Sequence, residues 1–214
     1  DLDGVFGSIQ AAAVAGVKLN ADGPDSITSV HVLDDSDGDG LADLFVGQGY
    51  LHDGSSIPGR LSFLTGYPSS NATVENIAEG ALGGSGSDRF GQSVAAGDFD
   101  GDGQSEFIVG APGANSGSGE LVYFDRLPSS LNGLVDASVL DDFAFSGITS
   151  NTTLGLGWEI ESIGDVDGDG ADDVIASNYN RWYSPDGAVY VLSGLCLHQG
   201  HALSESIITE YSSN

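Results

Sequence analysis

Short apolar runs recur along the chain, and turn-forming residues separate them. The runs are of three types, which precede an acidic stretch, follow it directly, or follow it at a distance. They occupy residues 27–33, 43–47 and 60–66, then 91–97, 106–110 and 120–126, and finally 158–164, 173–177 and 188–194. Gly, Ser, Asn, Asp and Pro fill the intervals, and no long segment has helical periodicity. This pattern predicts short β-strands joined by turns.

A fourth, weaker run closes each group of three, and ESIITEY at residues 205–211 is the clearest example. Four short antiparallel strands per unit are typical of one blade of a β-propeller. We therefore expect an all-β fold, a β-propeller with about three four-stranded antiparallel blades in this chain. The expected segments are 1–26, as outer strands of a preceding or shared blade, and three blades at 27–87, 88–153 and 154–214.

Each predicted blade contains one acidic loop with the pattern D-x-D-x-D-G-x-x-[DE]. The three loops start at Asp35, Asp98 and Asp165, at intervals of 63 and 67 residues. A nearly constant period of this size indicates a repeat architecture. The stretch VKLNADGPD at 17–25 resembles a degenerate copy, but it lies too close to Asp35 for a blade to fit between them.

Alternating carboxylates in a tightly curled loop suit a hard cation, because every second side chain can point inward. Ca²⁺ takes about six to eight oxygen ligands, and the glycine at the sixth position permits the sharp turn. The carboxylate at the ninth position completes the ligand set. The expected side-chain ligands are Asp35, Asp37, Asp39 and Asp43, then Asp98, Asp100, Asp102 and Glu106, then Asp165, Asp167, Asp169 and Asp173. Backbone carbonyl ligands are expected at Leu41, Gln104 and Ala171, which makes about three Ca²⁺ ions in all.

Two other interpretations of the loops fit less well. An EF-hand needs a glutamate at position twelve, where this chain has Val46, Val109 and Ala176 in apolar runs. Simple solvated turns would explain one acidic loop, but three evenly spaced copies, each followed by a predicted strand, favour metal sites. Mg²⁺ suits the loops less than Ca²⁺ does, since Mg²⁺ tends to keep its waters.

The formal net charge of −27, from 32 acidic and 5 basic side chains, excludes a nucleic-acid-binding role and binding to anionic membranes. No run of 18 apolar residues is present, so no membrane span is predicted. Cys196 is the single cysteine, and no disulfide can form within the chain.

Residues 89–112, RFGQSVAAGDFDGDGQSEFIVGAP, contain a Phe-Gly pair, an acidic loop and Gly-Ala-Pro in that order. This segment closely resembles the FG-GAP repeat of integrin α-subunit β-propellers and their bacterial relatives. Residues 156–177 are similar to a second copy, and residues 27–49 to a third that lacks the Phe-Gly pair. The resemblance implies a Ca²⁺-stabilised propeller with its loops on one face. It also implies a secreted, extracellular or cell-surface protein, where Ca²⁺ is abundant enough to fill weak sites.

Members of that family usually have about seven blades, and a propeller needs about four or more to close a ring. A chain with three blades is therefore expected to be part of a longer chain or to form a homo-oligomer, and we favour assembly. The start at Asp1 and the absence of methionine suggest a processed or excised product.

A cysteine, two histidines and two asparagines are further candidate sites. Cys196, His198 and His201 form C-x-H-x-x-H, which could bind Zn²⁺, but the spacing matches no strong template and no fourth ligand is identified. A buried cysteine and two loop histidines are the better interpretation. Asn71 and Asn151 begin Asn-x-Thr acceptor patterns, whose use for glycosylation the sequence does not reveal.

An aromatic stretch near the C-terminus is the candidate for binding a protein or glycan partner. It contains Tyr179, Arg181, Trp182 and Tyr183, whereas Trp158 is expected to pack between blades. No nucleophile with its base and no catalytic motif stands out, so a non-enzyme is expected. We expect a calcium-binding extracellular propeller that acts in adhesion or as a self-assembling structural subunit. The alternatives are a lectin-like carbohydrate-binding module and an accessory propeller of a larger secreted enzyme.

Overall fold

The structure is a computed structural model of the chain. It describes residues 18–21, 25–33, 40, 42–51, 58–65, 70–125, 133–137, 143–146, 155–180, 184–200 and 207–212. Only the backbone is described for residues 25–26, 50–51, 143–146, 179–180, 184–186 and 207–212.

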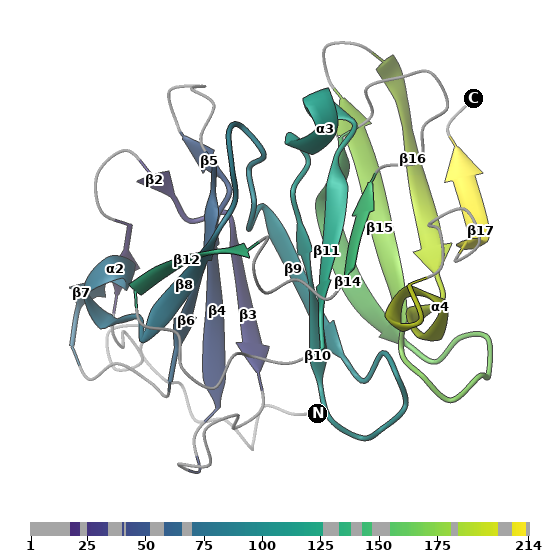
Figure 1. The fold of residues 1–214 in the computed structure, drawn as a ribbon, viewed down its shortest axis with the longest axis horizontal. Coiled ribbons are helices and arrows are strands. Elements are labelled where there is room, and N and C mark those ends of the chain that lie inside the picture. The colour runs from purple at the N-terminus through teal and green to yellow at the C-terminus, as the bar shows by residue number, and fades with distance from the viewer. Residues whose placement is uncertain are drawn as a thin grey trace, which may run out of the picture.

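Three sheets in chain order make up most of the described fold (Figure 1). The first contains β3 (Ser29–Leu33), β4 (Asp43–Gln48), β6 (Arg60–Leu64) and β8 (Gly80–Gly83). The second contains β9 (Ser93–Gly97), β10 (Glu106–Gly110), β11 (Glu120–Phe124) and β13 (Phe143–Ser146). The third contains β14 (Leu156–Gly164), β15 (Asp173–Asn180), β16 (Ser184–Leu192) and β17 (Ile207–Ser212). Each of these strand sets is an antiparallel meander, which confirms the predicted unit of four strands.

The three sheets pack face to face, and the first strand of each sheet lies next to the first strand of its neighbour. Strand β9 contacts β3 on one side and β14 on the other. This radial arrangement of four-stranded sheets is the propeller type of architecture that the sequence predicts. The described residues form a partial ring rather than a closed one.

The second sheet is buried on both faces, and successive side chains of its strand β10 belong to two different cores. Phe107 and Val109 of β10 belong to the core shared with the first sheet, whereas Ile108 between them belongs to the core shared with the third. Successive side chains of a strand point to opposite faces, so one continuous apolar run supplies both cores. This explains why β10 and β11 are apolar after the glutamate at which each begins, although their sheet is antiparallel.

Aromatic rings dominate the core between the first two sheets. The rings of Phe107 and Phe124 are stacked with centroids 4.7 Å apart, and the ring of Phe45 lies 4.8 Å from that of Phe107. Phe90, from the segment before β9, meets Phe124 edge-on at 6.3 Å. Such pairs add about 0.5–1.5 kcal/mol each beyond the area that they bury.

The first sheet has a fifth strand that the sequence analysis did not predict. Strand β12 (Gly133–Asp136), from the connection between β11 and β13, pairs in parallel with β8. It covers the outer edge of β8, which would otherwise present unpaired backbone groups. The second unit is thus joined to the first by backbone pairing as well as by the shared core.

The described residues of the N-terminal segment pair with strands of the first unit. Strand β1 (Leu19–Asn20) runs parallel to β7 (Ala72–Thr73), and β2 (Asp25–Ser26) runs antiparallel to β5 (Tyr50–Leu51). Leu19 of β1 and helix α2 (Val74–Ile77) pack against Val46 and Leu64, on the face of the first sheet that points away from the second. The other helices, α3 (Ala114–Gly117) and α4 (Gly194–His198), are equally short. No helix among the described residues is long and apolar enough to cross a bilayer.

Adjacent sheets touch backbone to backbone at a pair of glycines. A Cβ atom on Gly110, at the end of β10, would lie 2.2 Å from the carbonyl oxygen of Gly157 in the third sheet. Gly157 itself has a φ of +94°, and its carbonyl accepts a hydrogen bond of 2.8 Å from the Ser93 hydroxyl. Gly47 and Gly91 repeat the contact between the first two sheets, with 2.0 Å from the Gly47 Cβ position to the Gly91 oxygen.

The substitution Gly110→Ala should lower the free energy of unfolding by roughly 1–3 kcal/mol, because the added methyl group forces two backbones apart. For a domain of this size the melting temperature should fall by roughly 2–4 °C per kcal/mol. Gly83→Ala is the matched control, since its new Cβ meets only the Leu134 side chain, at 3.1 Å. Urea and thermal unfolding measure both variants, and equal losses would contradict the proposed close contact.

Candidate metal centre

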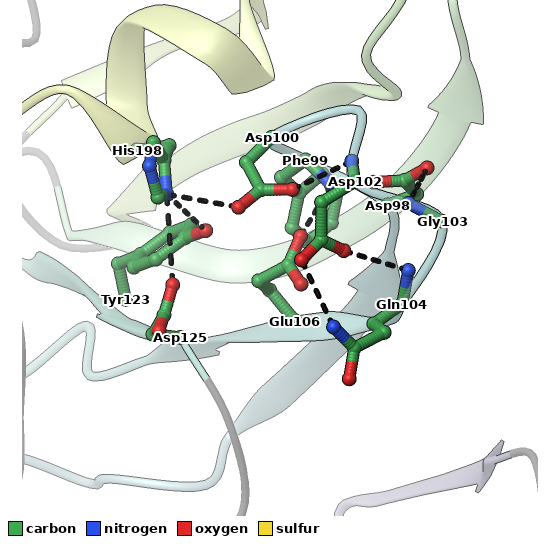
Figure 2. A network of polar contacts seen from close by, with 10 residues as sticks. All are labelled: Asp98, Phe99, Asp100, Asp102, Gly103, Gln104, Glu106, Tyr123, Asp125 and His198. Atoms are coloured by element: carbon green, nitrogen blue, oxygen red, sulfur yellow. Dashed lines mark hydrogen bonds and ion pairs between the residues drawn. The ribbon is translucent and has the colours of Figure 1, made fainter.

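The second acidic loop joins β9 to β10 and brings three carboxylates together. Asp98, Asp100 and Glu106 each offer one carboxylate oxygen, and these oxygens lie within 4.8 Å of one another. Figure 2 shows these three side chains together with Asp102 and the hydrogen bonds of the loop. Asp102, the fourth predicted side-chain ligand, is not part of this group.

Hydrogen bonds from the backbone to its own aspartates curl the loop. Asp100 Oδ1 accepts from the amide of Asp102 at 2.9 Å, and Asp102 Oδ1 accepts from the amide of Gln104 at 2.8 Å. Asp98 Oδ2 accepts from the amide of Gly103 at 2.9 Å. Asp and Asn side chains favour turns through such local bonds.

The third acidic loop, between β14 and β15, repeats this hydrogen-bond pattern position by position. Asp167 Oδ1 accepts from the amide of Asp169 at 3.0 Å, and Asp169 Oδ1 accepts from that of Ala171 at 3.0 Å. Asp165 Oδ2 accepts from the amide of Gly170 at 3.1 Å. Two loops 67 residues apart therefore share these hydrogen bonds. The third loop also brings three carboxylates together, those of Asp165, Asp167 and Asp173.

The first loop agrees with the other two at the two pattern positions that the structure describes, Gly40 and Asp43. Gly40, Gly103 and Gly170 occupy the sixth position and have φ values of +86°, +87° and +97°. This left-handed conformation suits glycine, and it makes the sharp turn that the pattern predicted. The predicted ligands Asp35, Asp37, Asp39 and Leu41 lie outside the described residues.

The ninth-position carboxylates are buried where each second strand begins. The exposed fraction is 0% for Asp43, 2% for Glu106 and 0% for Asp173. Glu106 Oε2 accepts from the amide of Phe99 at 2.7 Å, and Asp173 Oδ2 accepts from that of Val166 at 2.8 Å. Each of these two carboxylates therefore ties the start of its loop to the following strand.

Burial is the main influence on the titration of two of these carboxyls. Burial raises the pKa of Glu106 to about 7, with help from the negative charge of Asp100 and against the Phe99 amide, which lowers it. Burial also raises the pKa of Asp173, and the amides of Val166 and Gly194 partly offset the effect. Without a cation, the ionised loops are therefore electrostatically costly.

The residues fit a metal ion in a further respect. Asp98 Oδ1 is buried and has no hydrogen-bond partner, although Oδ2 of the same carboxylate is bonded. A buried carboxylate oxygen without a partner is costly unless something with positive charge meets it. An all-oxygen set of carboxylates is the ligand chemistry that hard divalent cations prefer.

The fifth-position aspartates hold the loop shape in this structure. Asp102 Oδ2 accepts from the side-chain amide of Gln104 at 2.9 Å, and Asp169 Oδ2 accepts from the Ser193 hydroxyl at 3.3 Å. Their role as direct ligands remains a prediction, as does that of the backbone carbonyls of Gln104 and Ala171.

Sequence reasoning missed Asp172, which connects the two loops. The amide of Asp98 donates to Asp172 Oδ2 at 3.2 Å, and the amide of Asp172 donates to the Asp98 carbonyl at 2.7 Å. The available signal was an aspartate at the eighth position of the third loop, where the other loops have Ala42 and Ser105.

The predicted ligand-binding stretch falls largely outside the described residues. Tyr179 lies in β15 with only its backbone described, and Arg181, Trp182 and Tyr183 are not described. The ring of Trp158 is partly buried and lies under the guanidinium group of Arg89, which belongs to the second unit. The guanidinium carbon is 5.4 Å from the ring centroid. Trp158 thus contacts the neighbouring blade, as the sequence analysis expected.

Comparison with known proteins gives two matches. Residues 90–124 match the FG-GAP repeat family. Phosphatidylinositol-glycan-specific phospholipase D of Rattus norvegicus is 33% identical over 157 residues, which is 65% of this chain and 17% of that protein. The family match includes the Phe90-Gly91 pair, the second loop and the glycine contact at Gly110. This chain therefore carries an FG-GAP repeat, in a β-fold of the propeller type.

Proposed function

We propose that this chain is a calcium-binding, non-catalytic propeller-type domain whose metal loops stabilise its blades. One observation carries the proposal. The second and third loops share three backbone-to-aspartate hydrogen bonds, the same glycine conformation and a buried ninth carboxylate. The hydrogen bonds that Glu106 and Asp173 accept from backbone amides offset only part of the cost of burying these carboxylates, and a bound cation would offset the rest.

Two groups of three carboxylates would each bind one ion. Asp98, Asp100 and Glu106 would hold an ion in the second loop, and Asp165, Asp167 and Asp173 one in the third. The bound ion supplies positive charge that offsets their mutual repulsion. Because each loop joins the first two strands of its blade, holding the loop closed also holds the strand pair in register.

Calcium fits better than other divalent ions, because the sites offer only oxygen atoms and the loops are mostly exposed. The first loop, with Asp43 already buried at its end, is proposed as a third site of the same kind. Weakly binding exposed loops fill only where Ca²⁺ is plentiful, which supports an extracellular or cell-surface location.

We further propose that the domain presents a surface for a protein or glycan partner, in adhesion or as an assembling structural subunit. The partial ring supports association with further blades, from a longer chain or from other copies. The stretch 178–187 is the proposed contact for a glycan. A glycan array probed with and without Ca²⁺ tests this, and the lectin-like alternative fails if no glycan binds in Ca²⁺.

A second candidate is an accessory propeller of a larger secreted enzyme. The curated relative is a phospholipase D, and this chain spans only 17% of its length. Under this alternative the chemistry belongs to other segments of the longer protein. Recovery of a parent gene that encodes a catalytic domain would favour this candidate over the adhesion role.

Removal of Ca²⁺ by a chelator should lower the melting temperature of the chain. At a hundredfold excess over Kd, each site adds about 2.7 kcal/mol, or roughly 5–10 °C in a domain of this size. Asp167→Asn should reduce this increment, whereas Glu159→Gln, on an exposed part of β14, should leave it intact. Calorimetry with and without Ca²⁺ measures both, and a melting temperature that chelation does not change contradicts calcium-stabilised folding.

Calcium binding near pH 6.5 should release protons, because Glu106 with a pKa of about 7 is partly protonated before the ion binds. In the unfolded chain this glutamate ionises near its ordinary pKa of 4.5. Without Ca²⁺, the contribution of Glu106 to the free energy of unfolding should therefore fall as the pH rises from about 4.5 to 7. The bound ion should reverse this loss.

The variant Glu106→Gln separates these effects, and Glu159→Gln is its matched control. The Glu106→Gln variant should release fewer protons per bound Ca²⁺ than the unaltered chain. Calorimetry in buffers of different ionisation enthalpy measures this number. The variant should also flatten the pH dependence of unfolding in chelator. Proton release as large as that of the unaltered chain would show that Glu106 does not meet the ion.

A further inference from the structure

A histidine from the third unit meets two carboxylates of the second unit at the lower edge of the sheets. His198, at the end of α4, places its Nδ1 atom 3.7 Å from Asp100 Oδ2 and 3.7 Å from Asp125 Oδ1. The hydroxyl of Tyr123 lies 3.0 Å from the same nitrogen. Figure 2 shows both carboxylates and the phenol directed at this one atom of the imidazole ring.

The distances suit shared coordination better than direct hydrogen bonds. At 3.7 Å, each carboxylate oxygen is beyond normal hydrogen-bond range of the nitrogen. Two ligands of one tetrahedral Zn²⁺, each bonded at about 2.0–2.2 Å, lie roughly 3.4 Å apart. The ligand atoms of Asp100, Asp125 and His198 all fall within 4.8 Å of one another, so a small adjustment would let one ion contact all three.

We propose that Asp100, Asp125 and His198 form a transition-metal site of the zinc class, distinct in chemistry from the all-oxygen calcium loops. Imidazole nitrogen suits Zn²⁺ and related ions, whereas Ca²⁺ prefers oxygen alone. The ion would use Nδ1 of His198, Oδ2 of Asp100 and Oδ1 of Asp125, and it would replace the hydrogen bond that Nδ1 shares with the Tyr123 hydroxyl.

Tyr123 positions the imidazole for this role. Its side chain is fully buried, and its ring meets that of His198 edge-on, with centroids 5.8 Å apart and planes at 69°. The ring packing restricts rotation of the imidazole, so Nδ1 stays aimed at the carboxylates.

The site joins two units of the fold. Asp100 and Asp125 belong to the second unit, on the acidic loop and at the end of β11, whereas His198 belongs to the third. A bound ion would therefore tie α4 to the neighbouring sheet, beside the calcium loop with which it shares Asp100. The inference does not depend on calcium occupying that loop, because its ligand set includes an imidazole that the loop lacks.

The structure separates this site from the sequence motif that contains the same histidine. C-x-H-x-x-H would unite Cys196, His198 and His201, but the metal-compatible groups of the described residues include no cysteine. His201 lies outside those residues. The ligands that do come together are separated by up to 98 positions in the sequence, which is why the motif did not reveal them.

Binding of Co²⁺ to the full chain in saturating Ca²⁺ tests the site, because tetrahedral Co²⁺ absorbs visible light and Zn²⁺ should displace it. We expect one equivalent of displaceable Co²⁺. His198→Gln and Asp125→Asn should each weaken binding by about 100-fold, given that loss of even an outer-shell partner costs 10–100-fold. The controls Cys196→Ser and His201→Gln should bind as the unaltered chain does.

Cooperative thermal unfolding, measured in every variant, shows that each one still folds. Retention of cooperative unfolding with loss of Co²⁺ binding in both His198→Gln and Asp125→Asn supports the site. The proposal is overturned if the unaltered chain binds no Co²⁺, if Asp125→Asn binds it normally, or if either control loses it. Should His198→Gln fail to fold, the half-exposed Asp125 still gives the decisive comparison.

Discussion

A buried carboxylate at the start of the second strand of each blade is the constraint around which the rest of the fold is arranged. Glu106 and Asp173 reach back to bind the amides of Phe99 and Val166, so each acidic loop is closed by the strand that follows it. The same closure buries both carboxylates, and burial raises the pKa of each. A loop built in this way is shaped by its own hydrogen bonds and is electrostatically complementary to a cation.

Contacts between blades depend on a second constraint, the close approach of backbones. Gly110 lies against Gly157, and Gly47 lies against Gly91, at distances that leave no space for a Cβ atom. Isolated bridges from Gly59 to Phe90 and from Gly119 to Leu156 repeat beside them. The glycines of the FG-GAP pattern are therefore positions where neighbouring sheets meet. The acidic loop lies between these glycines in the sequence. Packing and metal chemistry are thus adjacent parts of one repeated unit.

Most of the repeated features could be predicted, because each is local in the chain. The short apolar runs, the turn residues and the alternating aspartates lie within a few residues of one another, and their spacing alone indicates blades and loops. The partners of Asp98 show where this reasoning stops. Its own loop supplies Gly103, which the pattern implies, but Asp172 comes from the next blade and depends on how the two sheets are rotated against each other.

The sequence alone was sufficient for the type of fold, the number of four-stranded units and the residues of the acidic loops, because repetition and periodicity are properties of the chain. Only the folded protein brings Asp125, Tyr123 and His198 to one place and adds β12 to the edge of β8. These contacts join residues of different blades, and no spacing along the chain encodes the angle at which two sheets pack. The core between the sheets sets that angle, and the angle decides which side chains meet.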